Sequence, residues 1–230
     1  MSSDTFRRQV DWLGSGALRV VSVEELLGLD DDANAAALTF DDGFSNFATE
    51  AAPRLHEWRL PATLFVVTGH VGRDNRWQGR TQRGVPVLPL LDWEALGRLA
   101  ESGVSLGAHT RTHPNLMAIG PDELEDEIAG SAAEMERRLG QRPAGLAYPY
   151  GAVDSRIAAV TARCFRWAVT TDFRAVARPD LPTMLPRFDA WYFKDADILA
   201  NWGRPGFRVW AWSRRQGRRA RAGVCRLIRS

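Results

Sequence analysis

The sequence predicts an α/β protein whose strands form a parallel sheet or barrel. Short apolar segments alternate with amphipathic segments along the 230 residues, the rhythm of strands that are connected through helices. The apolar segments carry almost no charge, as expected of strands covered on both faces. With 45 % hydrophobic residues, the chain can form the core of one large domain or two small ones.

Helices and strands alternate in the first half of the chain. Apolar residues over 6–13 recur at helical spacing, and the helix expected over Val23–Leu27 begins with a capping-box pattern of Ser22 and Glu25. The predicted elements that follow are a strand over Ala35–Phe40, a helix over 47–58, a strand over 62–68, a helix over 92–101 and a strand over 104–108. Residues 69–89 are rich in glycine, proline and arginine and predict a long surface loop, a class of loop that is often functional.

The second half of the chain repeats this order. A strong helix is predicted over Pro121–Leu139, with proline at its start and Gly140 just past its end. Another helix is predicted over Ser155–Cys164. Short strands are predicted over 146–148, 167–170 and 184–188.

The net charge of +2 gives no general argument for binding to nucleic acid, and no nucleic-acid partner is predicted. The charge is uneven, because the chain beyond Trp202 has no acidic residue. Its arginines are Arg204, Arg208, Arg214, Arg215, Arg218, Arg219, Arg221, Arg226 and Arg229. We interpret this run as solvated or disordered, with contact to nucleic acid or anionic lipid as the alternative.

The start of the chain lacks the apolar segment of a signal peptide, and no stretch is long and uncharged enough to span a bilayer. Two cysteines, Cys164 and Cys225, form neither a disulfide framework nor a metal knuckle, which favours a reducing compartment. The sequence as it stands predicts a cytoplasmic protein.

Two adjacent carboxylates, Asp41 and Asp42, follow the predicted strand Ala35–Phe40 and precede Gly43. Adjacent side chains on a strand point to opposite faces, so both reach one site only where the strand ends and bends, as Gly43 permits. Two carboxylates so close repel each other and lose hydration, which is tolerated mainly beside a cation or an essential proton. The alternative is an acidic turn that caps a helix beginning near Ser45.

His109 and His113 follow the predicted strand over 104–108, at the end of the strand where α/β proteins build their sites. Imidazoles bind zinc and neighbouring transition metals, and a carboxylate from the first strand would complete a three-ligand site. Pro114 and the preceding strand leave no room for the helical H-E-x-x-H arrangement. The alternative is a pair of loop histidines that only make hydrogen bonds.

Other polar and aromatic residues are weaker candidates. His56 lies in a predicted surface helix and is interpreted as structural, whereas His70 follows a strand on the same predicted edge as Asp41 and is a candidate acid group. Tyr148 and Tyr150 surround a proline after another predicted strand. Such a turn can offer a backbone N–H to an oxyanion and an aromatic face to a sugar.

Three segments, in this order and at these separations, together resemble the polysaccharide deacetylase family, whose catalytic unit is the NodB-homology domain. They are Thr39-Phe40-Asp41-Asp42-Gly43, His109-Thr110 with His113, and Tyr148-Pro149-Tyr150-Gly151. The resemblance covers roughly residues 6–187. It implies a distorted, incomplete (β/α) barrel over residues 1–200, which leaves residues 201–230 as a basic, arginine-rich C-terminal tail.

The resemblance also implies an enzyme that removes acetyl groups from N-acetylated sugars with a divalent metal, usually zinc, with Co²⁺, Ni²⁺ or Mn²⁺ as alternatives. By position, the metal ligands would be Asp42, His109 and His113. Asp41 would be the general base, Thr110 matches the hydroxyl residue of the histidine motif, and Tyr150 matches the residue whose backbone N–H helps to form the oxyanion hole. A metal lowers the pKa of a bound water, so a neighbouring carboxylate can take its proton.

The sequence departs from the family pattern in three places. Ala147 stands where the third motif usually begins with arginine, and Arg187 is our candidate to orient Asp41 instead. No histidine follows His113, so the late histidine that protonates the leaving amine is missing. His70 or a water then supplies the proton, or turnover is slow or lost. Many relatives also begin with an extra strand, and its absence predicts a barrel open at one edge or a misassigned gene start.

The predicted function is hydrolysis of a carbon–nitrogen bond in an acetylated carbohydrate. The residues predicted to contact the sugar are Tyr148 and Trp191, with Tyr150, Phe188 and Tyr192 as further aromatic candidates. The same site could instead cleave an O-acetyl ester or another amide. A catalytically silent carbohydrate-binding relative is the alternative from a different class, which the missing histidine favours and the intact pair Asp41 and Asp42 opposes.

Overall fold

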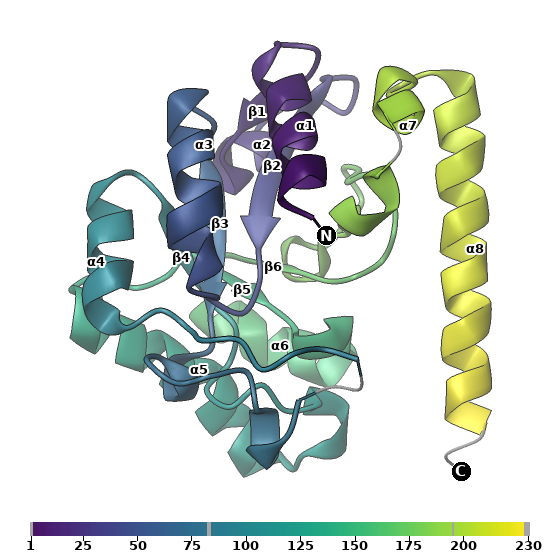
Figure 1. Cartoon of the computed structure of the whole chain (residues 1–230). Helices are drawn as coiled ribbons and strands as arrows, with labels where there is room; N and C mark the ends of the chain where they lie inside the picture. Colours follow the sequence, from purple (N-terminus) through teal and green to yellow (C-terminus); the bar gives the residue numbers. More distant parts are fainter. Residues whose placement is uncertain (1, 82–83, 195, 228–230) are drawn as a thin grey trace.

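A computed structural model describes residues 2–81, 84–194 and 196–227. Its centre is one sheet of six parallel strands in sequence order, with β1 and β6 at the two edges (Figure 1). The strands are β1 Arg19–Val21, β2 Ala35–Phe40, β3 Ala62–Val66, β4 Ser105–Ala108, β5 Gly145–Ala147 and β6 Trp167–Val169. The sheet curls into half of a barrel, which confirms the predicted α/β class and the incomplete barrel.

The two faces of the sheet bury different side chains because neighbouring residues on a strand point in opposite directions. Leu64 and Val66 of β3 belong to the core beneath the helices, whereas Phe65 between them belongs to the core inside the curl. Trp167 of β6 lies beside Phe65, with the ring centroids 5.9 Å apart. Gly145 of β5 leaves room for this indole, since a Cβ there would lie 2.2 Å from the ring of Trp167.

Helices connect the strands and complete the outer core. They are α1 Ser3–Gly14, α2 Val23–Leu27, the π-helical turn Phe47–Ala51 with α3 Ala52–Glu57, α4 Trp93–Glu101, α5 Pro121–Leu139 and α6 Ser155–Cys164. Side-chain caps begin several of them: Ser22 accepts a hydrogen bond from the backbone N–H of Glu25, and Asp92 from that of Ala95. α5 ends at Gly140, whose φ of 73° is the left-handed conformation that glycine adopts without strain.

Two strands differ from the prediction. β1 was not predicted, because three residues are too few to show a strand's periodicity. The strand predicted over 184–188 is wrong, since this segment forms only a single bridge, from Leu185 to Val169 of β6. Pro186 follows immediately and has no N–H with which to continue a ladder.

The C-terminal part of the described chain is helical. It comprises α7 Ala196–Ala200 and α8 Pro205–Leu227, and α8 stands along one side of the molecule (Figure 1). Phe207 and Ala211 of α8 are buried in an aromatic cluster with Phe173 and Phe193. Along the described residues, no helix is both long and apolar enough to cross a membrane.

The first turns of α8 are therefore part of the folded unit. Arg215 donates to both carboxylate oxygens of Asp172, at 2.9 and 2.7 Å, and Arg218 donates to the carbonyl oxygen of Thr171. The expectation that the arginine run is solvated or disordered is wrong for Arg215 and Arg218, which these contacts hold against the domain, whereas Arg208 and Arg214 are exposed as expected. The side chains of Arg219, Arg221, Arg226 and Arg229 lie outside the described residues.

Candidate metal and catalytic site

The predicted site residues lie where neighbouring strands end. Asp41 and Asp42 follow β2, His109 follows β4, and the 3₁₀ turn Pro149–Gly151 follows β5. Because the strands are parallel, their carboxyl ends share one edge of the sheet, and α/β proteins place their sites at this edge.

Asp42, His109 and His113 form a compact cluster. Oδ1 of Asp42 lies 3.4 Å from Nε2 of His109 and 3.6 Å from Nε2 of His113, and the three ligand atoms lie within 4.8 Å of one another. A tetrahedral zinc ion with bonds of about 2.1 Å separates its ligand atoms by roughly 3.4 Å. The donor set and its spacing therefore fit a divalent metal ion. The convergence that the sequence predicted is present, and metal binding at this cluster stays a prediction.

Backbone groups orient the two imidazoles. Nδ1 of His109 lies 2.7 Å from the carbonyl oxygen of Ala147, so Nδ1 donates and Nε2 keeps its lone pair for a metal. The backbone N–H of His113 donates to Oγ1 of Thr110 at 3.1 Å. Asp42, Thr110 and His113 all have positive φ values, of 75°, 65° and 61°. Non-glycine residues adopt this conformation at a cost that is typically found at functional sites.

Glu127 of α5 fixes the loop that carries the histidines, and the sequence analysis missed it. This carboxylate is buried and accepts hydrogen bonds from the backbone N–H groups of Arg111 (2.8 Å) and Thr112 (2.9 Å) and from the hydroxyl of Thr112 (2.6 Å). A signal was present in the sequence. Glu127 falls between Leu124 and Ser131 on the stripe of α5 that packs on the core, where an acidic residue needs a partner.

Arg187 holds the other carboxylate of the pair. Nη1 donates to Oδ1 of Asp41 at 2.7 Å and Nη2 donates to Oδ2 at 3.0 Å. Further donations to Oγ1 of Thr39 (3.1 Å) and to the carbonyl oxygen of Thr170 (3.0 Å) fix the guanidinium in place. The structure thus brings Arg187 to Asp41, the position required for the orienting role, and that role stays a prediction.

The surroundings set the ionisation of the site. Burial raises the pKa of Asp41, but the Arg187 guanidinium, helped by His109, outweighs burial and brings this pKa to about 2. Burial and then the neighbouring His109 lower the pKa of His113 to about 2. Burial opposes charging of His109, yet the nearby carboxylates of Asp42 and Asp41 raise its pKa. At neutral pH Asp41 is therefore ionised and His113 is neutral, the form in which imidazole binds metals.

Trp77 lies between His70 and the cluster in a chain of ring contacts. Its indole stacks on His113 and meets His70 edge-on, with both pairs of centroids 4.8 Å apart. Nδ1 of His70 lies 3.2 Å from the carbonyl oxygen of Asp74. The structure brings His70 against Trp77 and does not bring it into the Asp42, His109 and His113 cluster. Trp77 sits in the predicted surface loop, where nothing in the pattern marked it as buried.

The predicted aromatic residues separate into exposed and buried groups. Tyr150 is 48 % exposed, has a φ of 60°, and contacts His113 with ring centroids 4.8 Å apart. Tyr148 is only 1 % exposed, and its hydroxyl donates to the carbonyl oxygen of Thr183. The substrate contact predicted for Tyr148 is therefore wrong, because its ring is part of the core and has no free face.

The remaining aromatic candidates lie in the segment that precedes α7. Phe188 and Tyr192 are half-buried and pack on Phe173 in the cluster beneath α8, and their contact with a sugar stays a prediction. Trp191 is 52 % exposed, and the ammonium group of Lys194 lies over its ring. A substrate contact of Trp191 stays a prediction.

A curled parallel sheet with an Asp-His-His cluster beside an ionised aspartate defines a class of protein, an α/β-barrel protein with a site suited to metal-assisted hydrolysis. The sequence model of the family described as polysaccharide deacetylase matches residues 28–165, and the chain belongs to that family. This confirms the predicted family.

Relatives agree with this assignment. The chain is 28 % identical over 172 residues to a chitooligosaccharide deacetylase of Bradyrhizobium, covering 73 % of this chain and 70 % of the relative. It is 24 % identical over 179 residues to YxkH of Bacillus subtilis, where it covers 75 % of this chain and only 59 % of YxkH. Enzymes that carry the name deacetylase are hydrolases of carbon–nitrogen or ester bonds.

Solved structures share the fold. IcaB from Ammonifex degensii superposes with a TM-score of 0.70 at 25 % identity, covering 82 % of this chain and 83 % of IcaB. The deacetylase PplD of Streptococcus pyogenes, solved in complex with acetate, superposes with a TM-score of 0.68 at 24 % identity, covering 81 % of this chain and 80 % of PplD. The half-barrel is thus the fold of the family.

Proposed function

We propose that this chain is a metal-dependent hydrolase that removes acetyl groups from N-acetylated sugars. The observation that carries the proposal is the convergence of Asp42, His109 and His113 beside Asp41, which Arg187 holds ionised. A cluster of one carboxylate and two imidazoles suits zinc, with Co²⁺, Ni²⁺ or Mn²⁺ as alternatives. When bound, the cation supplies Lewis-acid activation of the carbonyl and of the attacking water.

The residues of the chain would carry the proton. Asp41 accepts it from the attacking water, while Arg187 keeps both carboxylate oxygens in a fixed orientation. A carboxyl group with a pKa of about 2 is a weak base, so it accepts this proton only while the water is being activated, and it then readily releases the proton. The leaving amine is the acceptor, directly or through a water. Asp41 would in this way replace the missing late histidine.

The turn after β5 would complete the site. The positive φ of Tyr150 turns the backbone sharply beside His113, and its N–H is the proposed donor to the developing oxyanion. The half-exposed ring of Tyr150 offers a face for a pyranose. His70 has no role in this scheme, because its contact is with Trp77.

The proposed substrate is a carbohydrate that contains N-acetylglucosamine. The relatives named for chitooligosaccharides (28 % identical) and for poly-β-1,6-N-acetyl-D-glucosamine (21 % identical) support this choice. The second candidate is an inactive carbohydrate-binding relative, which the absence of any histidine after His113 favours. Hydrolysis of an O-acetyl ester at the same site is a variant of the first proposal. Location in the cytoplasm and the lack of a nucleic-acid partner stay predictions.

Metal analysis combined with acetate release separates these candidates. The purified protein is expected to hold one divalent ion per chain and to release acetate from chitooligosaccharides, with loss of both after chelation and return of both on adding Zn²⁺. Bound metal without acetate release from any N-acetylated or O-acetylated sugar would support the binding relative. Acetate release that survives complete removal of metal would contradict the proposed mechanism.

A further inference from the structure

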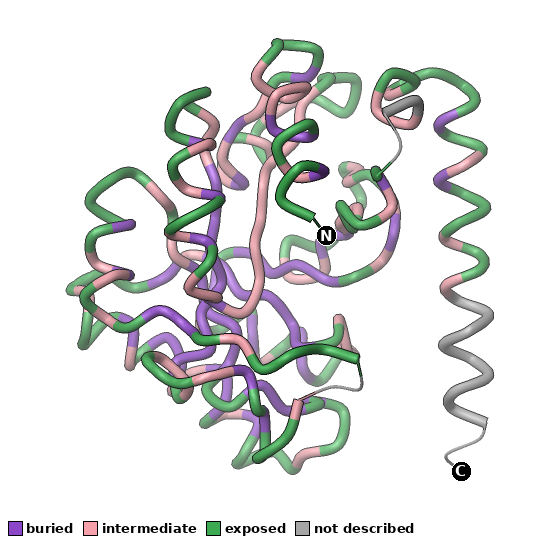
Figure 2. Tube along the Cα trace, viewed as in Figure 1, coloured by how far each residue is buried: buried purple, intermediate pink, exposed green. Residues whose placement is uncertain are grey.

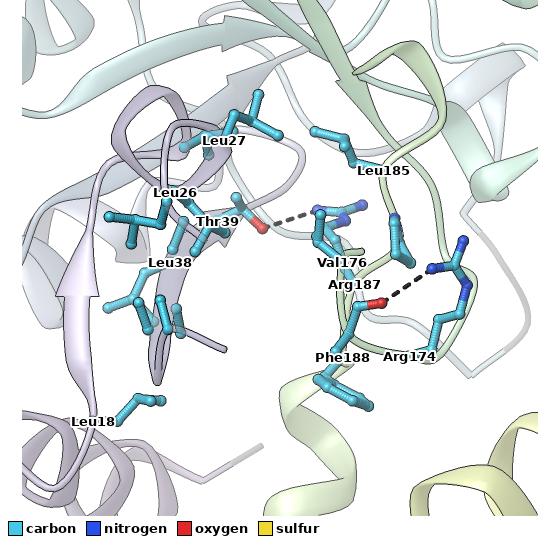
Figure 3. Close-up of a pocket in the computed structure, with 18 of the residues that line it drawn as sticks. Leu18, Leu26, Leu27, Leu38, Thr39, Arg174, Val176, Leu185, Arg187 and Phe188 are labelled. Carbon is cyan, nitrogen blue, oxygen red and sulfur yellow. Dashed lines mark hydrogen bonds between the residues drawn. The ribbon is translucent and has the colours of Figure 1, made fainter. Parts of the chain in front are cut away.

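A second hollow lies beside the site, inside the open half of the barrel. It is a cavity of about 660 Å³ between two walls. One wall comes from Leu18, α2, β2 and the segment between these two elements, and the other comes from residues 174–188 (Figure 3). Gln9, Trp12 and Leu13 of α1 also line the cavity. The cavity reaches the site only at Thr39 and Arg187. Its volume lies in the range of about 300–1,000 Å³ that is usual for small-molecule sites.

The sequence of β2 explains why the cavity exists. This strand begins with three alanines, Ala35–Ala37, where a strand between two neighbours usually carries larger branched side chains. All six residues of β2 are only partly buried, whereas all five of β3 are fully buried. Figure 2 shows the difference as a continuous pink β2 beside the purple β3. The small side chains leave apolar space that the chain itself does not fill.

Polar contacts at the ends hold the two walls apart. At the inner end, Arg187 donates to Thr39. At the outer end, the backbone N–H of Arg178 donates to Asp31 at 2.9 Å, and its guanidinium donates to Asp30. These contacts connect the two walls at both ends of the cavity. The cavity therefore exists without a bound ligand.

The lining between these ends is mostly apolar, and besides aliphatic side chains it includes the rings of Trp12, Phe188, Phe193 and Trp202. The side chains that face each other across the cavity are Leu18, Leu26, Leu27, Leu38, Val176 and Leu185 (Figure 3). The cations of the lining are already neutralised, since Arg174 pairs with Asp172 and Asp180, and Arg187 with Asp41. The walls therefore favour a neutral hydrocarbon over a fatty-acid carboxylate, whose charge would find no free partner.

We propose that this cavity is a binding site for the hydrocarbon chain of a neutral, lipid-like ligand. The hydrocarbon lies between Leu18 with the leucines of α2 and β2 on one side and the segment 174–188 on the other, and the polar end of the ligand points to Thr39 and Arg187. The ligand is a substituent of the sugar substrate or a separate lipid that binds beside it.

Calorimetric titration of the full chain with n-alkanols from hexanol to decanol tests the proposal without any need for catalysis. Each added methylene is expected to tighten the Kd about fourfold until the cavity is full, with a stoichiometry of one per chain. Octanoate is expected to bind at least tenfold more weakly than octanol. An affinity that does not depend on chain length, or octanoate that binds as tightly as octanol, would overturn the proposal.

Two variants fill the cavity from opposite walls. Ala36→Phe and Val176→Trp are each expected to weaken octanol binding more than tenfold. Ala100→Phe, at an exposed position on α4, is the matched control and should bind like the wild type. Wild-type affinity in both filling variants would overturn the proposal. So would a wild-type dimer in sedimentation that Ala36→Phe dissociates, because the occupant would then be a second copy.

A kinetic comparison, which rests on the proposed deacetylase function, shows whether the hydrocarbon is part of the sugar substrate or of a separate lipid. Octyl and methyl β-N-acetylglucosaminide are compared as substrates. If the octyl glycoside has the lower KM and Ala36→Phe abolishes this difference, the hydrocarbon belongs to the substrate. If the two KM values are equal while alkanols still bind, the hydrocarbon belongs to a separate lipid. Absence of turnover on both glycosides would count against the proposed function and leave the calorimetric result standing.

Discussion

Arg187 contacts Asp41 through both oxygens of its carboxylate, at 2.7 and 3.0 Å, although 146 residues separate them in sequence. Its Nε also donates to the carbonyl oxygen of Thr170 beyond β6. The pair therefore ties β2 to the far edge of the half-barrel, across the gap where further strands would close a complete barrel. One ion pair thus serves both the site and the open edge of the fold.

Removal of Arg187 is expected to slow turnover without loss of metal. In Arg187→Ala, Asp41 loses its fixed orientation, and kcat should fall roughly 100-fold, the loss typical of a misplaced catalytic group, while KM and metal content change little. Arg187→Lys keeps the charge without the two-pronged contact and should recover only part of the rate. Kinetics and metal analysis check this result, with Arg163→Ala on the surface as control. Loss of metal in Arg187→Ala would contradict the positioning role.

Asp41 and Asp42 are expected to have different functions, which substitution of each residue alone can distinguish. Asp42→Ala removes a proposed ligand and should abolish metal retention after dialysis. Asp41→Asn keeps the shape of the side chain and should retain the metal, with kcat lowered by a factor of about 10²–10⁴, the usual contribution of a general base. Metal content and acetate release measured on the same samples decide the matter. Unchanged turnover in Asp41→Asn would remove Asp41 from the mechanism.

Glu127 is expected to control metal affinity from outside the cluster. Glu127→Ala removes both acceptor oxygens and leaves the backbone N–H groups of Arg111 and Thr112 without their partner, so the loop from Thr110 to His113 loses its anchor. Partners that orient metal ligands are worth about 10–100-fold in affinity, and competition with a chelator should show a loss of that size. Glu125→Ala, at a half-exposed position on the same helix, is the control. Equal Zn²⁺ affinity in the two variants would refute this role.

The sequence predicted most elements of the fold because each follows a local pattern. Pro121–Leu139 and Ser155–Cys164 have the predicted ends, since caps and apolar spacing lie within the helices themselves. β1 and the false strand over 184–188 show the opposite case. Three residues give no period, and whether an extended segment joins a sheet depends on a neighbour that is distant in sequence.

The site divides in the same way. His109, His113 and a carboxylate of the pair Asp41 and Asp42 were predicted because they stand in short segments at strand ends, and the family resemblance assigned Asp42. Arg187 was predicted because Ala147 stands where the family usually has an arginine. Glu127 and Trp77 were missed, since their importance comes only from what they contact. Tyr148 was misplaced because its motif fixes the position of its backbone and not the burial of its ring.

The helix α8 is expected to contribute to the stability of the whole fold. Phe207→Ala empties a buried place in the cluster with Phe173 and Phe193 and should lower the free energy of unfolding by about 3 kcal/mol. Trp212 lies on the same helix and is 62 % exposed, so Trp212→Ala should change the free energy of unfolding by less than about 0.5 kcal/mol. Urea unfolding measures both. A loss of the same size in the two variants would mean that α8 is independent of the domain.

Tyr148 is expected to make the free energy of unfolding fall at alkaline pH. Burial raises its pKa to about 12, from an ordinary value of 10.0. Below pH 10 the hydroxyl is protonated in both the folded and unfolded states. Above pH 10 the unfolded state ionises first, so the stability from this group is lost as the pH rises towards 12, about 1.4 kcal/mol of it by pH 11.

The variant Tyr148→Phe lacks this titration and separates it from other alkaline effects. At pH 7 it should be less stable than the wild type by about 1 kcal/mol, because the hydrogen bond to the carbonyl oxygen of Thr183 is lost. Between pH 9 and pH 11 the wild type should lose more stability than the variant, so that the difference closes. Urea unfolding at pH 7, 9, 10 and 11 follows it. A difference that stays constant to pH 11 would show that the Tyr148 hydroxyl ionises as readily in the fold as in water and would contradict the raised pKa.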